Sequence, residues 1–321
     1  MITILLATHN GADTLPAVLN AYCKLESPYD GWELIIVDNG STDSTQEIVH
    51  AFQSCLPLTY VFEPRLGKAV AQNTGLSRIN GDLVVMTDDD ALPRPDWLVQ
   101  MRLAADSEPT YSIFGGAIVP LWEIPPEDWI LNWSSYIFGV THGDTAEGPT
   151  IVSRVYGANM AVRSAVLKDG HLFDTSLGPV GSRYQVGEDT DFLQRLSEAG
   201  CKVWHSKRAV VEHIILKGQM TRAWALGRAV PKGRADYRRQ LKADPNSPRP
   251  VCWLGVPRYM IREILTQAAR WVGAMFTQSA DASFREHWQL YFLVGHAIEG
   301  RVLHRKRPVN KKATNARLEY E

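Results

Sequence analysis

Three consecutive aspartates, Asp88 to Asp90, are the residues of this sequence best suited to chemistry. They directly follow the apolar run Leu83–Met86, which Gly81-Asp82 separates from the residues before it and which is typical of a buried strand. Open α/β sheets bind ligands at the carboxyl ends of their strands. Adjacent carboxylates repel each other unless water or a cation neutralises them, and a hard divalent cation binds both carboxylate and phosphate oxygens. The triplet therefore indicates a metal site for a nucleoside diphosphate, with a solvated acidic turn as the alternative.

Polar residues also follow the strands predicted before the triplet. Asp38 follows the apolar run Glu33–Val37 and precedes a Gly-Ser-Thr turn, so a carboxylate and backbone N–H groups are available there for a nucleobase. Capping of the next helix is the alternative role for Asp38, and it is the role we expect for Asp43. Arg65 and Lys68 bracket a glycine turn and could reach a diphosphate or ribose, or could be ordinary surface charges.

The elements that must position these residues alternate between strand and helix over the first 90 residues. Apolar runs predict strands at Ile2–Ala7, Glu33–Val37, Leu58–Phe62 and Leu83–Met86. Helical patterns lie between them at Thr14–Cys23, Ser44–Gln53 and Lys68–Arg78. This alternation predicts right-handed crossovers and a parallel sheet.

The rest of the chain is less regular and then becomes helical. We predict strands at Ile113–Val119, Val155–Val162, Lys202–Trp204 and Ala209–Glu212. We predict a loop rich in Trp and Pro at Pro120–Trp133 and a helix at Glu188–Ala199 that ends at Gly200. Beyond residue 218 the chain is predicted to be helical, with a linker at Ala243–Pro250 and a disordered basic tail after Arg305.

Composition narrows the class of protein. The 321 residues are 45% hydrophobic and 21% charged, which is typical of a soluble globular chain with two domains or one large domain and an appendage. The four cysteines form no CxxC pair, so neither a zinc site nor a disulfide framework is indicated, and reduced thiols suit a cytoplasmic protein. Met1–Leu6 lacks the basic region of a signal peptide, and no window of 18 uncharged apolar residues predicts a membrane span.

The net charge of −1 conceals an uneven distribution of charge. Residues 1–201 contain 11 Lys and Arg against 26 Asp and Glu, a balance of −15, whereas residues 202–321 contain 23 against 9, a balance of +14. The basic residues alternate with apolar ones at helical spacing. This pattern favours a membrane surface, or docking of the two halves on each other, over binding of nucleic acid.

Six motifs, in this order, resemble those of the family 2 glycosyltransferases. The most recognisable is Ile35-Ile36-Val37-Asp38-Asn39-Gly40-Ser41-Thr42-Asp43. The others are the opening Ile4-Leu5-Leu6-Ala7-Thr8-His9-Asn10, then Arg65-Leu66-Gly67-Lys68 with Asn73 and Gly75, Asp88-Asp89-Asp90 at the DxD position, Gly187-Glu188-Asp189, and Val211-Glu212-His213. The resemblance covers residues 4–213 and weakens after about residue 240.

The resemblance implies a GT-A type α/β fold, with a mixed, mostly parallel sheet flanked by helices and a helical C-terminal appendage. It implies that the nucleotide is bound by Thr8, Asn10, Asp38, Arg65, Lys68, Asp88 and Asp89. It implies that Mn²⁺ or Mg²⁺ on the diphosphate is held by Asp90, Asp88 and His213. It also implies that Asp189 is the catalytic base, with Glu188 and Asp191 as candidates that could equally be helix-start carboxylates.

Aromatic residues gather in the middle of the chain, at Trp122, Trp129, Trp133 and Tyr136. Aromatic faces stack on sugar rings, so the three tryptophans are candidate acceptor residues. The alternative is that they belong to the hydrophobic core.

Together these features predict an inverting glycosyltransferase that moves a sugar, from a UDP-sugar most readily, to a hydroxyl acceptor. By resemblance, the acceptor is a glycan or lipid-linked glycan in cell-surface polysaccharide or glycolipid synthesis, and no nucleic acid is involved. We expect residues 1–110 to bind the nucleotide sugar, residues 111–217 to bind the acceptor and residues 218–321 to form a helical region with a basic tail. A sugar nucleotidyltransferase is the first rival, but the turn after the first strand has no Lys or Arg for a triphosphate. A non-catalytic nucleotide-sugar-binding protein is the second rival.

Two apolar stripes in the C-terminal region predict amphipathic helices, at Ile261–Phe276 and Phe284–Val302. Aromatic residues and arginines flank both stripes, which suits a helix lying in an anionic membrane interface on the inner face of the cell membrane. Packing on the catalytic domain, or a homodimer contact, is the alternative.

Overall fold

The computed structural model describes residues 1–141, 145–167, 169–181, 184–243 and 250–306. The chain divides into two compact units, Met1–Thr221 and Arg222–Glu321. The tail beyond residue 306 and most of the predicted linker lie outside the described residues. None of the described helices combines the length and the apolar composition that crossing a membrane requires.

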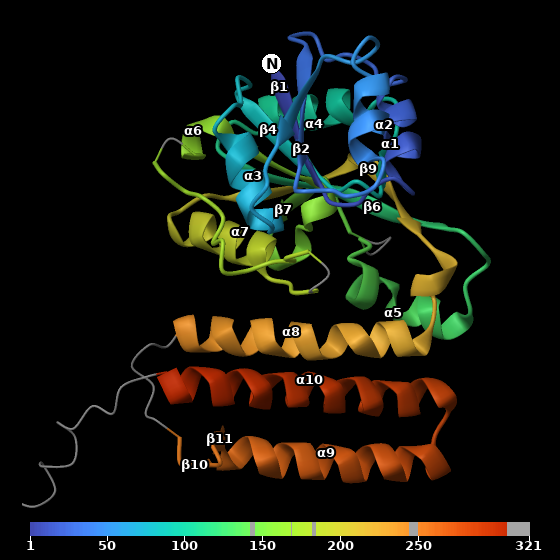
Figure 1. The fold of residues 1–321 in the computed structure, drawn as a ribbon, viewed down its shortest axis with the longest axis vertical. Helices are drawn as coiled ribbons and strands as arrows, with labels where there is room; N and C mark the ends of the chain where they lie inside the picture. The colour runs from blue at the N-terminus through green and yellow to red at the C-terminus, as the bar shows by residue number, and fades with distance from the viewer. Residues whose placement is uncertain (142–144, 168, 182–183, 244–249, 307–321) are drawn as a thin grey trace, which may run out of the picture. The chain divides into compact units, whose positions relative to one another are not determined.

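A nine-stranded mixed sheet forms the centre of the first unit, in the strand order β3-β2-β1-β4-β8-β6-β9-β5 with β7 beside β9 (Figure 1). The first four strands are parallel to one another, β8 is antiparallel to both of its neighbours, and β6 runs parallel to β9. The strands are β1 (Ile2–Thr8), β2 (Trp32–Asp38), β3 (Leu58–Phe62), β4 (Leu83–Thr87), β5 (Ala91–Pro93), β6 (Ile113–Trp122), β7 (Gly148–Thr150), β8 (Met160–Arg163) and β9 (Val203–Ile215).

Helices cover both faces of this sheet, which is why β1, β2 and β4 are nearly continuous apolar runs. On one face, alternate side chains such as Ile4 and Ile36 pack against α1 (Leu15–Tyr22), α2 (Thr45–Ala51) and α4 (Trp97–Ser107). On the other face, Leu5 and Ile35 pack against α3 (Lys68–Leu76) and α7 (Glu188–Glu198). The four strands and three helices predicted before residue 90 are confirmed, apart from shifts at their ends.

Some elements between residues 111 and 215 differ from the prediction. The predicted loop at Pro120–Trp133 is wrong, because β6 continues to Trp122 and α5 (Asp128–Phe138) follows two prolines. The predicted strand Val155–Val162 is mostly wrong, since short 3₁₀ turns occupy residues 152–154 and 157–159 and only β8 is extended. The two short strands predicted after residue 201 form the single strand β9.

One buried asparagine connects β6, β9 and α4 where the β6–β9 register shifts, after Gly116. Asn159 is fully buried, and its side-chain amide donates to the carbonyl oxygens of Ala117 and Ala209, both at 2.9 Å. Its own carbonyl oxygen accepts from Trp97 Nε1 at 2.9 Å. Asn159 therefore satisfies backbone carbonyls that an interrupted ladder would leave unpaired.

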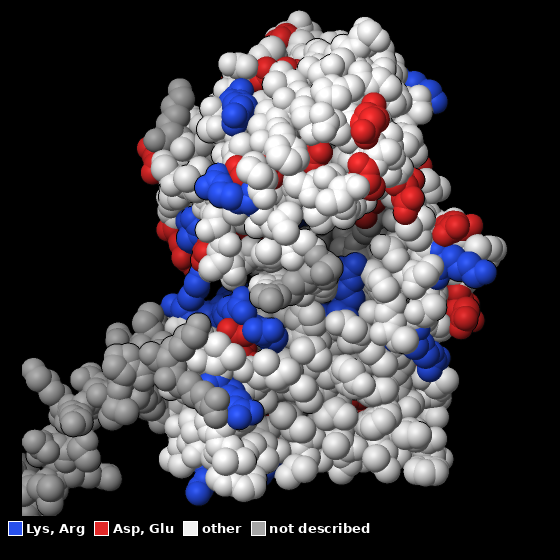
Figure 2. All heavy atoms as spheres, in the orientation of Figure 1, with Lys and Arg blue, Asp and Glu red and all other residues white. Residues whose placement is uncertain are grey.

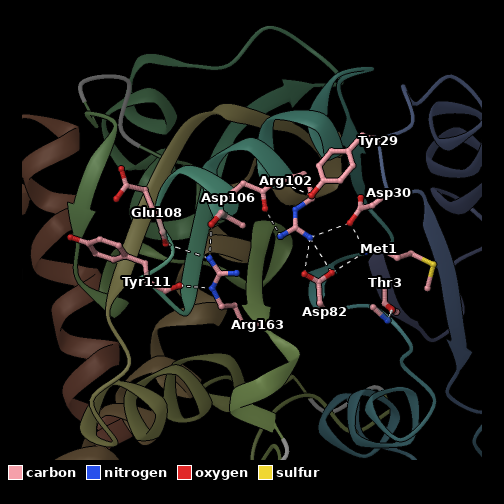
Figure 3. Close-up of polar contacts among 12 residues, drawn as sticks. Met1, Thr3, Tyr29, Asp30, Asp82, Arg102, Asp106, Glu108, Tyr111 and Arg163 are labelled. Carbon is pink, nitrogen blue, oxygen red and sulfur yellow. Dashed lines mark hydrogen bonds and ion pairs between the residues drawn. The ribbon is translucent and has the colours of Figure 1, made fainter.

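A charged cluster closes the sheet at the amino ends of β1 and β4 (Figure 3). Arg102 on α4 has a side chain only 4% exposed, and it pairs with Asp82 at 2.9 Å and Asp106 at 2.8 Å. Asp30 contacts the same guanidinium at 3.4 Å, and the terminal amine of Met1 binds Asp30 and Asp82. The carboxyl ends of the same parallel strands carry a separate group of polar residues.

The described residues of the second unit form three long helices and a short hairpin: α8 (Arg222–Ala243), the hairpin of β10 (Cys252–Trp253) and β11 (Val256–Pro257), α9 (Arg258–Thr277) and α10 (Ala280–Lys306). α10 packs between α8 and α9 (Figure 1). Phe284 and Trp288 of the second predicted stripe are 3% and 1% exposed. The predicted membrane contact is therefore wrong for Phe284 and Trp288, because both side chains pack in the interior of the second unit.

Candidate active site

Several of the polar residues predicted to be functional lie at and after the carboxyl ends of β1, β2 and β4. Because the three strands are parallel and adjacent, Thr8, Asp38 and Asp88 lie at one edge of the sheet. α3 begins at Lys68 and α7 begins at Glu188, so both helices start with a residue of the same group.

Lys68 is the residue that joins these groups. Its Nζ donates to Asp88 Oδ1 at 2.7 Å and lies 3.6 Å from Asp189 Oδ2 and 3.7 Å from Glu188 Oε1. Burial alone would lower the pKa of Lys68, but the charges of Asp189, Asp88 and Glu188 outweigh it and hold the pKa well above its ordinary value. A permanently charged ammonium group therefore connects the acidic triplet to the start of α7.

The two carboxylates at the start of α7 differ in exposure. The Glu188 side chain is 7% exposed, and burial together with Asp189 raises the pKa of Glu188 to about 7. The Asp189 side chain is 18% exposed, and its Oδ1 accepts from Gln72 Nε2 at 3.3 Å. A methyl group on Gly157 would lie 2.0 Å from Asp189 Oδ2, so only glycine fits beside this carboxylate. Asp189 is therefore the more exposed of the two carboxylates.

Asp89 faces the first strand. Its Oδ2 accepts a hydrogen bond from Thr8 Oγ1 at 2.5 Å, and a methyl group on Gly11 would lie 2.3 Å from that hydroxyl. Burial and the charge of Asp90 raise the pKa of Asp89 to about 7, although the hydrogen bond from Thr8 opposes this. Thr8 and Asp89 thus fix the triplet against β1.

Asp90, directly before β5, pairs with His213 on the neighbouring strand β9. His213 Nε2 lies 3.2 Å from Asp90 Oδ2, and His213 Nδ1 donates to the carbonyl oxygen of Phe138 at 3.1 Å. Burial lowers the pKa of His213, but Asp90 more than compensates and the net pKa is raised; the same pairing lowers the pKa of Asp90. Because Nδ1 carries the proton, a neutral imidazole would direct the lone pair of Nε2 toward Asp90.

Asp90 and His213 could also hold a metal ion that takes only a few of its ligands from the protein. Asp90 Oδ1 is buried and has no hydrogen-bond partner among the described residues. No group of three His, Cys, Asp or Glu side chains in the described part of the chain could hold an ion alone. A divalent cation bound to a diphosphate needs only one or two protein ligands, so this pair fits such an ion.

Asp38 and Asn10 shape the turn after β2. Asp38 is 1% exposed; its Oδ1 accepts from the backbone N–H of Ser41 at 2.9 Å and its Oδ2 from Tyr60 at 2.8 Å. Asn10, which has a left-handed backbone (φ +55°), accepts from the N–H of Thr42 at 2.8 Å. Asp43 accepts from the first turn of α2, as expected of a capping residue. The carboxylate of Asp38 is thus engaged within the protein.

Arg65 is held by a residue that we did not single out from the sequence. Its guanidinium binds Glu63 through Nε at 2.9 Å and Nη2 at 2.8 Å, and Glu63 also accepts from Thr74 at 2.7 Å. The Arg65 side chain is 75% exposed, whereas Glu63 is buried, and Arg65 lowers the pKa of Glu63 to about 2. Glu63 therefore orients an exposed cation beside the site.

Asp191 and the three candidate tryptophans make contacts of their own. Asp191 pairs with Arg195 one turn further along α7, at 2.8 Å. Trp122 stacks edge-on against Phe138. Trp129 is 6% exposed, and Trp133 contacts Tyr136 on the same helix.

Gln72 was also missed, although it is one helical turn after Lys68 and therefore on the same face of α3. Asn73, by contrast, binds the backbone of Phe173 through both atoms of its amide, which gives it a packing role. The sequence does contain a signal for Gln72, namely its i+4 spacing from a motif lysine.

The chain is similar in sequence to two glycosyltransferases of known name. Glucosyl-dolichyl phosphate glucuronosyltransferase of Haloferax volcanii is 23% identical over 211 residues, covering 65% of this chain and 67% of that protein. Pre-mycofactocin glycosyltransferase of Mycobacterium tuberculosis is 28% identical over 217 residues, covering 66% of this chain. Those residues are only 42% of the mycobacterial protein, so this chain corresponds to less than half of that relative.

Solved structures agree on the fold. The mannosyltransferase PcManGT from Pyrobaculum calidifontis, in complex with GDP-Man and Mn²⁺, has a TM-score of 0.62 at 21% identity, covering 95% of this chain and 88% of that chain. Residues 1–349 of TarS from S. aureus, in complex with UDP-GlcNAc, have a TM-score of 0.54 at 14% identity, covering 100% of this chain and 93% of that chain. The predicted GT-A fold is confirmed.

A sequence profile described as glycosyl transferase family 2 matches residues 3–170, which is more than half of the chain. This match includes the first four motifs noted in the sequence and the strands that position Asp38 and Asp88 to Asp90. The chain therefore belongs to glycosyl transferase family 2.

Proposed function

We propose that this protein moves a sugar from a nucleoside diphosphate sugar to a hydroxyl acceptor with inversion of the anomeric configuration. The reaction has two requirements: the charge of the leaving diphosphate must be stabilised, and the acceptor hydroxyl must lose a proton. The described residues offer groups of both kinds at one edge of the sheet.

The observation that carries the proposal is the bridge made by Lys68. One ammonium group contacts Asp88 of the triplet and both carboxylates at the start of α7. Lys68 therefore supplies positive charge beside the place assigned to the diphosphate, and it also fixes the position of Asp189. A solvated acidic turn would not need a lysine shared by three carboxylates and only 20% exposed.

In this proposal Asp189 accepts the proton of the acceptor hydroxyl. It is more exposed than Glu188, it is oriented by Gln72 and Lys68, and it borders the backbone of Gly157. A single base opposite the leaving group is consistent with one in-line displacement, which inverts the anomeric carbon. Asp191 is used by Arg195 within the helix and is not assigned a role in catalysis.

Asp90 and His213 would hold Mn²⁺ or Mg²⁺, with the diphosphate supplying further oxygen ligands. When bound, the cation would act as a Lewis acid on the leaving diphosphate. The presence of Mn²⁺ with GDP-Man in PcManGT supports this proposal for a chain of the same fold. Asp88, also predicted as a metal ligand, is bound by Lys68 and would position the lysine.

The donor and the acceptor are proposed at the level of class. Residues 1–110 would bind the nucleotide, with Thr8, Asn10, Asp38, Asp89 and Arg65 shaping its site, and UDP remains the first choice of nucleotide. Residues 111–217 would bind the acceptor, a glycan or lipid-linked glycan, in polysaccharide or glycolipid synthesis. We place the protein in the cytoplasm, peripheral to the inner face of the cell membrane.

A thermal-shift screen of UDP- and GDP-sugars, with and without Mn²⁺, tests the donor and the metal together. A donor that binds only the folded protein raises the melting temperature, and the rise grows with the ratio of donor concentration to its dissociation constant. We expect at least one nucleotide sugar to stabilise the protein more with Mn²⁺ than without it. Asp90→Ala should abolish the Mn²⁺-dependent part, whereas Asp169→Ala, which changes an exposed acid outside the site, should retain it. Failure of every nucleotide sugar to stabilise the wild type would contradict the proposal.

A further inference from the structure

One apolar surface of the helical unit is exposed, and we call it the outer surface of α9. It comprises the tip of the β10–β11 hairpin and the side of α9 that faces away from α10. Trp253 and Leu254 at the tip are 60% and 73% exposed, and Leu265 and Phe276 on the helix are 66% and 83% exposed. Apolar side chains exposed together in this way indicate a binding surface rather than isolated surface residues.

The packing of α9 explains which side is exposed. Met260, Gln267 and Ala274 recur every seven residues and are buried, and Gln267 Nε2 donates to the backbone oxygen of Glu286 on α10 at 3.0 Å. Trp271 stacks on His287 of α10. The opposite stripe is exposed, and its members follow one another at intervals of three or four residues: Arg258, Arg262, Leu265, Ala269, Val272 and Phe276.

The hairpin presents an apolar residue where a polar one is usual. Leu254 and Gly255 both have positive φ, +50° and +83°, so they form the two-residue turn. Such turns favour asparagine, aspartate or glycine, and a leucine there has an unfavourable backbone conformation. The turn places Leu254 in solvent next to Trp253, without any gain from burial within the described residues.

The charges of this surface identify its partner. Arg258 and Arg262 lie in the same stripe as Leu265 and Phe276, at the end nearest the hairpin, and Glu263 is the only acidic residue within α9. On the face seen in Figure 2, basic side chains also predominate over acidic ones along the helices. A partner must therefore accept apolar side chains and neutralise arginines within one surface.

A second copy of this chain does not satisfy both conditions. In an antiparallel contact of two α9 helices, Arg258 and Arg262 would lie against Val272 and Phe276 of the other copy, burying charge in an apolar environment. In a parallel contact the arginines would face each other. A lipid interface accepts both groups, since phosphates bind the guanidinium groups while the apolar side chains enter the acyl boundary.

We propose that the outer surface of α9 binds an anionic lipid bilayer, with Trp253 and Leu254 inserted at the interface and Arg258 and Arg262 bound to lipid phosphates. This deepens the peripheral location proposed above and rests on it for the choice of an anionic leaflet. It does not depend on sugar transfer.

Co-sedimentation of the full chain with vesicles tests this proposal. We expect binding to phosphatidylcholine vesicles containing about a third phosphatidylglycerol and weaker binding to pure phosphatidylcholine, because surface arginines each add attraction to anionic lipid. The double variants Trp253→Ser/Leu254→Ser and Arg258→Glu/Arg262→Glu should each reduce the partition coefficient about tenfold or more. Leu103→Ser and Arg208→Glu change exposed residues of the first unit and should leave binding unchanged.

Three results would overturn the proposal: no binding by the wild type, unchanged binding by both double variants, or a wild-type dimer that the same variants dissociate. The melting temperature of each variant shows whether it is folded. The donor-induced thermal shift should survive in both double variants, and Asp189→Asn should still bind vesicles. A failure of the lipid proposal is therefore distinguishable from a failure of the proposed transfer reaction.

Discussion

At the scale of single residues, the site depends on charges that hold one another in place. Lys68 contacts three carboxylates, Glu63 holds Arg65, and His213 pairs with Asp90. Lys68 and Asp90 could be predicted from the sequence, because one begins a helix and the other follows a strand, whereas His213 was predicted from a motif and lies within β9. Glu63 could not, because its role depends on a bidentate contact that only the fold of the β3–α3 turn creates.

Asp189→Asn should slow transfer strongly without affecting donor binding. Asparagine keeps the size of the side chain but cannot accept the proton in the transition state, so kcat should fall about 10²- to 10⁴-fold. The dissociation constant of the donor should change little, since the base contacts the acceptor. Asp191→Asn is the matched control and should keep near-normal kcat. Comparable losses in both variants would remove Asp189 from the assigned role.

Glu63 should make the stability of the protein depend on acid pH. Its pKa in the folded protein is about 2, below the ordinary value of 4.5, because of Arg65. Its stabilising contribution is therefore complete above about pH 4.5 and is lost as the pH falls toward 2. Urea denaturation between pH 6 and pH 3 should show a smaller loss in Glu63→Gln than in the wild type. Glu47→Gln, a change at an exposed position, should follow the wild type, and parallel curves for all three proteins would refute this reading.

At the scale of elements, the parallel strands and their crossover helices could be predicted from the sequence. The periodicity of apolar residues within each segment agrees with the turn and capping residues at its ends. The antiparallel half could not be predicted as well. β9 contains polar and charged residues in its middle, at His205 to Arg208, so its apolar ends appear as two strands. α5 follows two prolines and carries exposed apolar residues, so its helical pattern resembles that of a loop.

Asn159 should be essential for the packing of β6, β9 and α4. Alanine would leave two backbone carbonyls and the Trp97 indole N–H buried without partners, so we expect a loss of about 3 kcal/mol in the free energy of unfolding. His213 lies on β9, so turnover should fall as well. Equilibrium denaturation measures the first effect, with Asn132→Ala on the exposed side of α5 as control. A loss below about 1 kcal/mol would mean that water replaces the amide.

At the scale of the whole molecule, each unit has its own internal organisation. The first unit has a structural charge cluster at the amino ends of its strands and the candidate site at their carboxyl ends. The second unit is a helical stack in which Phe284 and Trp288 of α10 are buried while the outer surface of α9 is exposed. The sequence predicted both amphipathic helices, but it did not distinguish the packed stripe from the exposed one, because both have the same periodicity.

Arg102→Met should destabilise the first unit without altering donor binding. The change removes the cation shared by Asp30, Asp82 and Asp106. The free energy of unfolding should fall by about 3 kcal/mol. This is the low end for breaking a buried ion pair, because Asp82 is more than half exposed. Denaturation curves should show the loss, and the donor-induced thermal shift should persist. Arg78→Met, at an exposed position, should show no comparable loss. Wild-type stability in Arg102→Met would show that the cluster contributes little.

The configuration of the transferred sugar tests the central claim most directly. The donor that gives the largest Mn²⁺-dependent thermal shift is incubated with the protein and a hydroxyl acceptor, and the anomeric proton of the first product is followed by NMR. Our account predicts that an α-linked donor gives a β-linked product, and that Asp189→Asn forms it about 10²- to 10⁴-fold more slowly. A product that retains the configuration of the donor would contradict it, since a single displacement assisted by Asp189 cannot retain it.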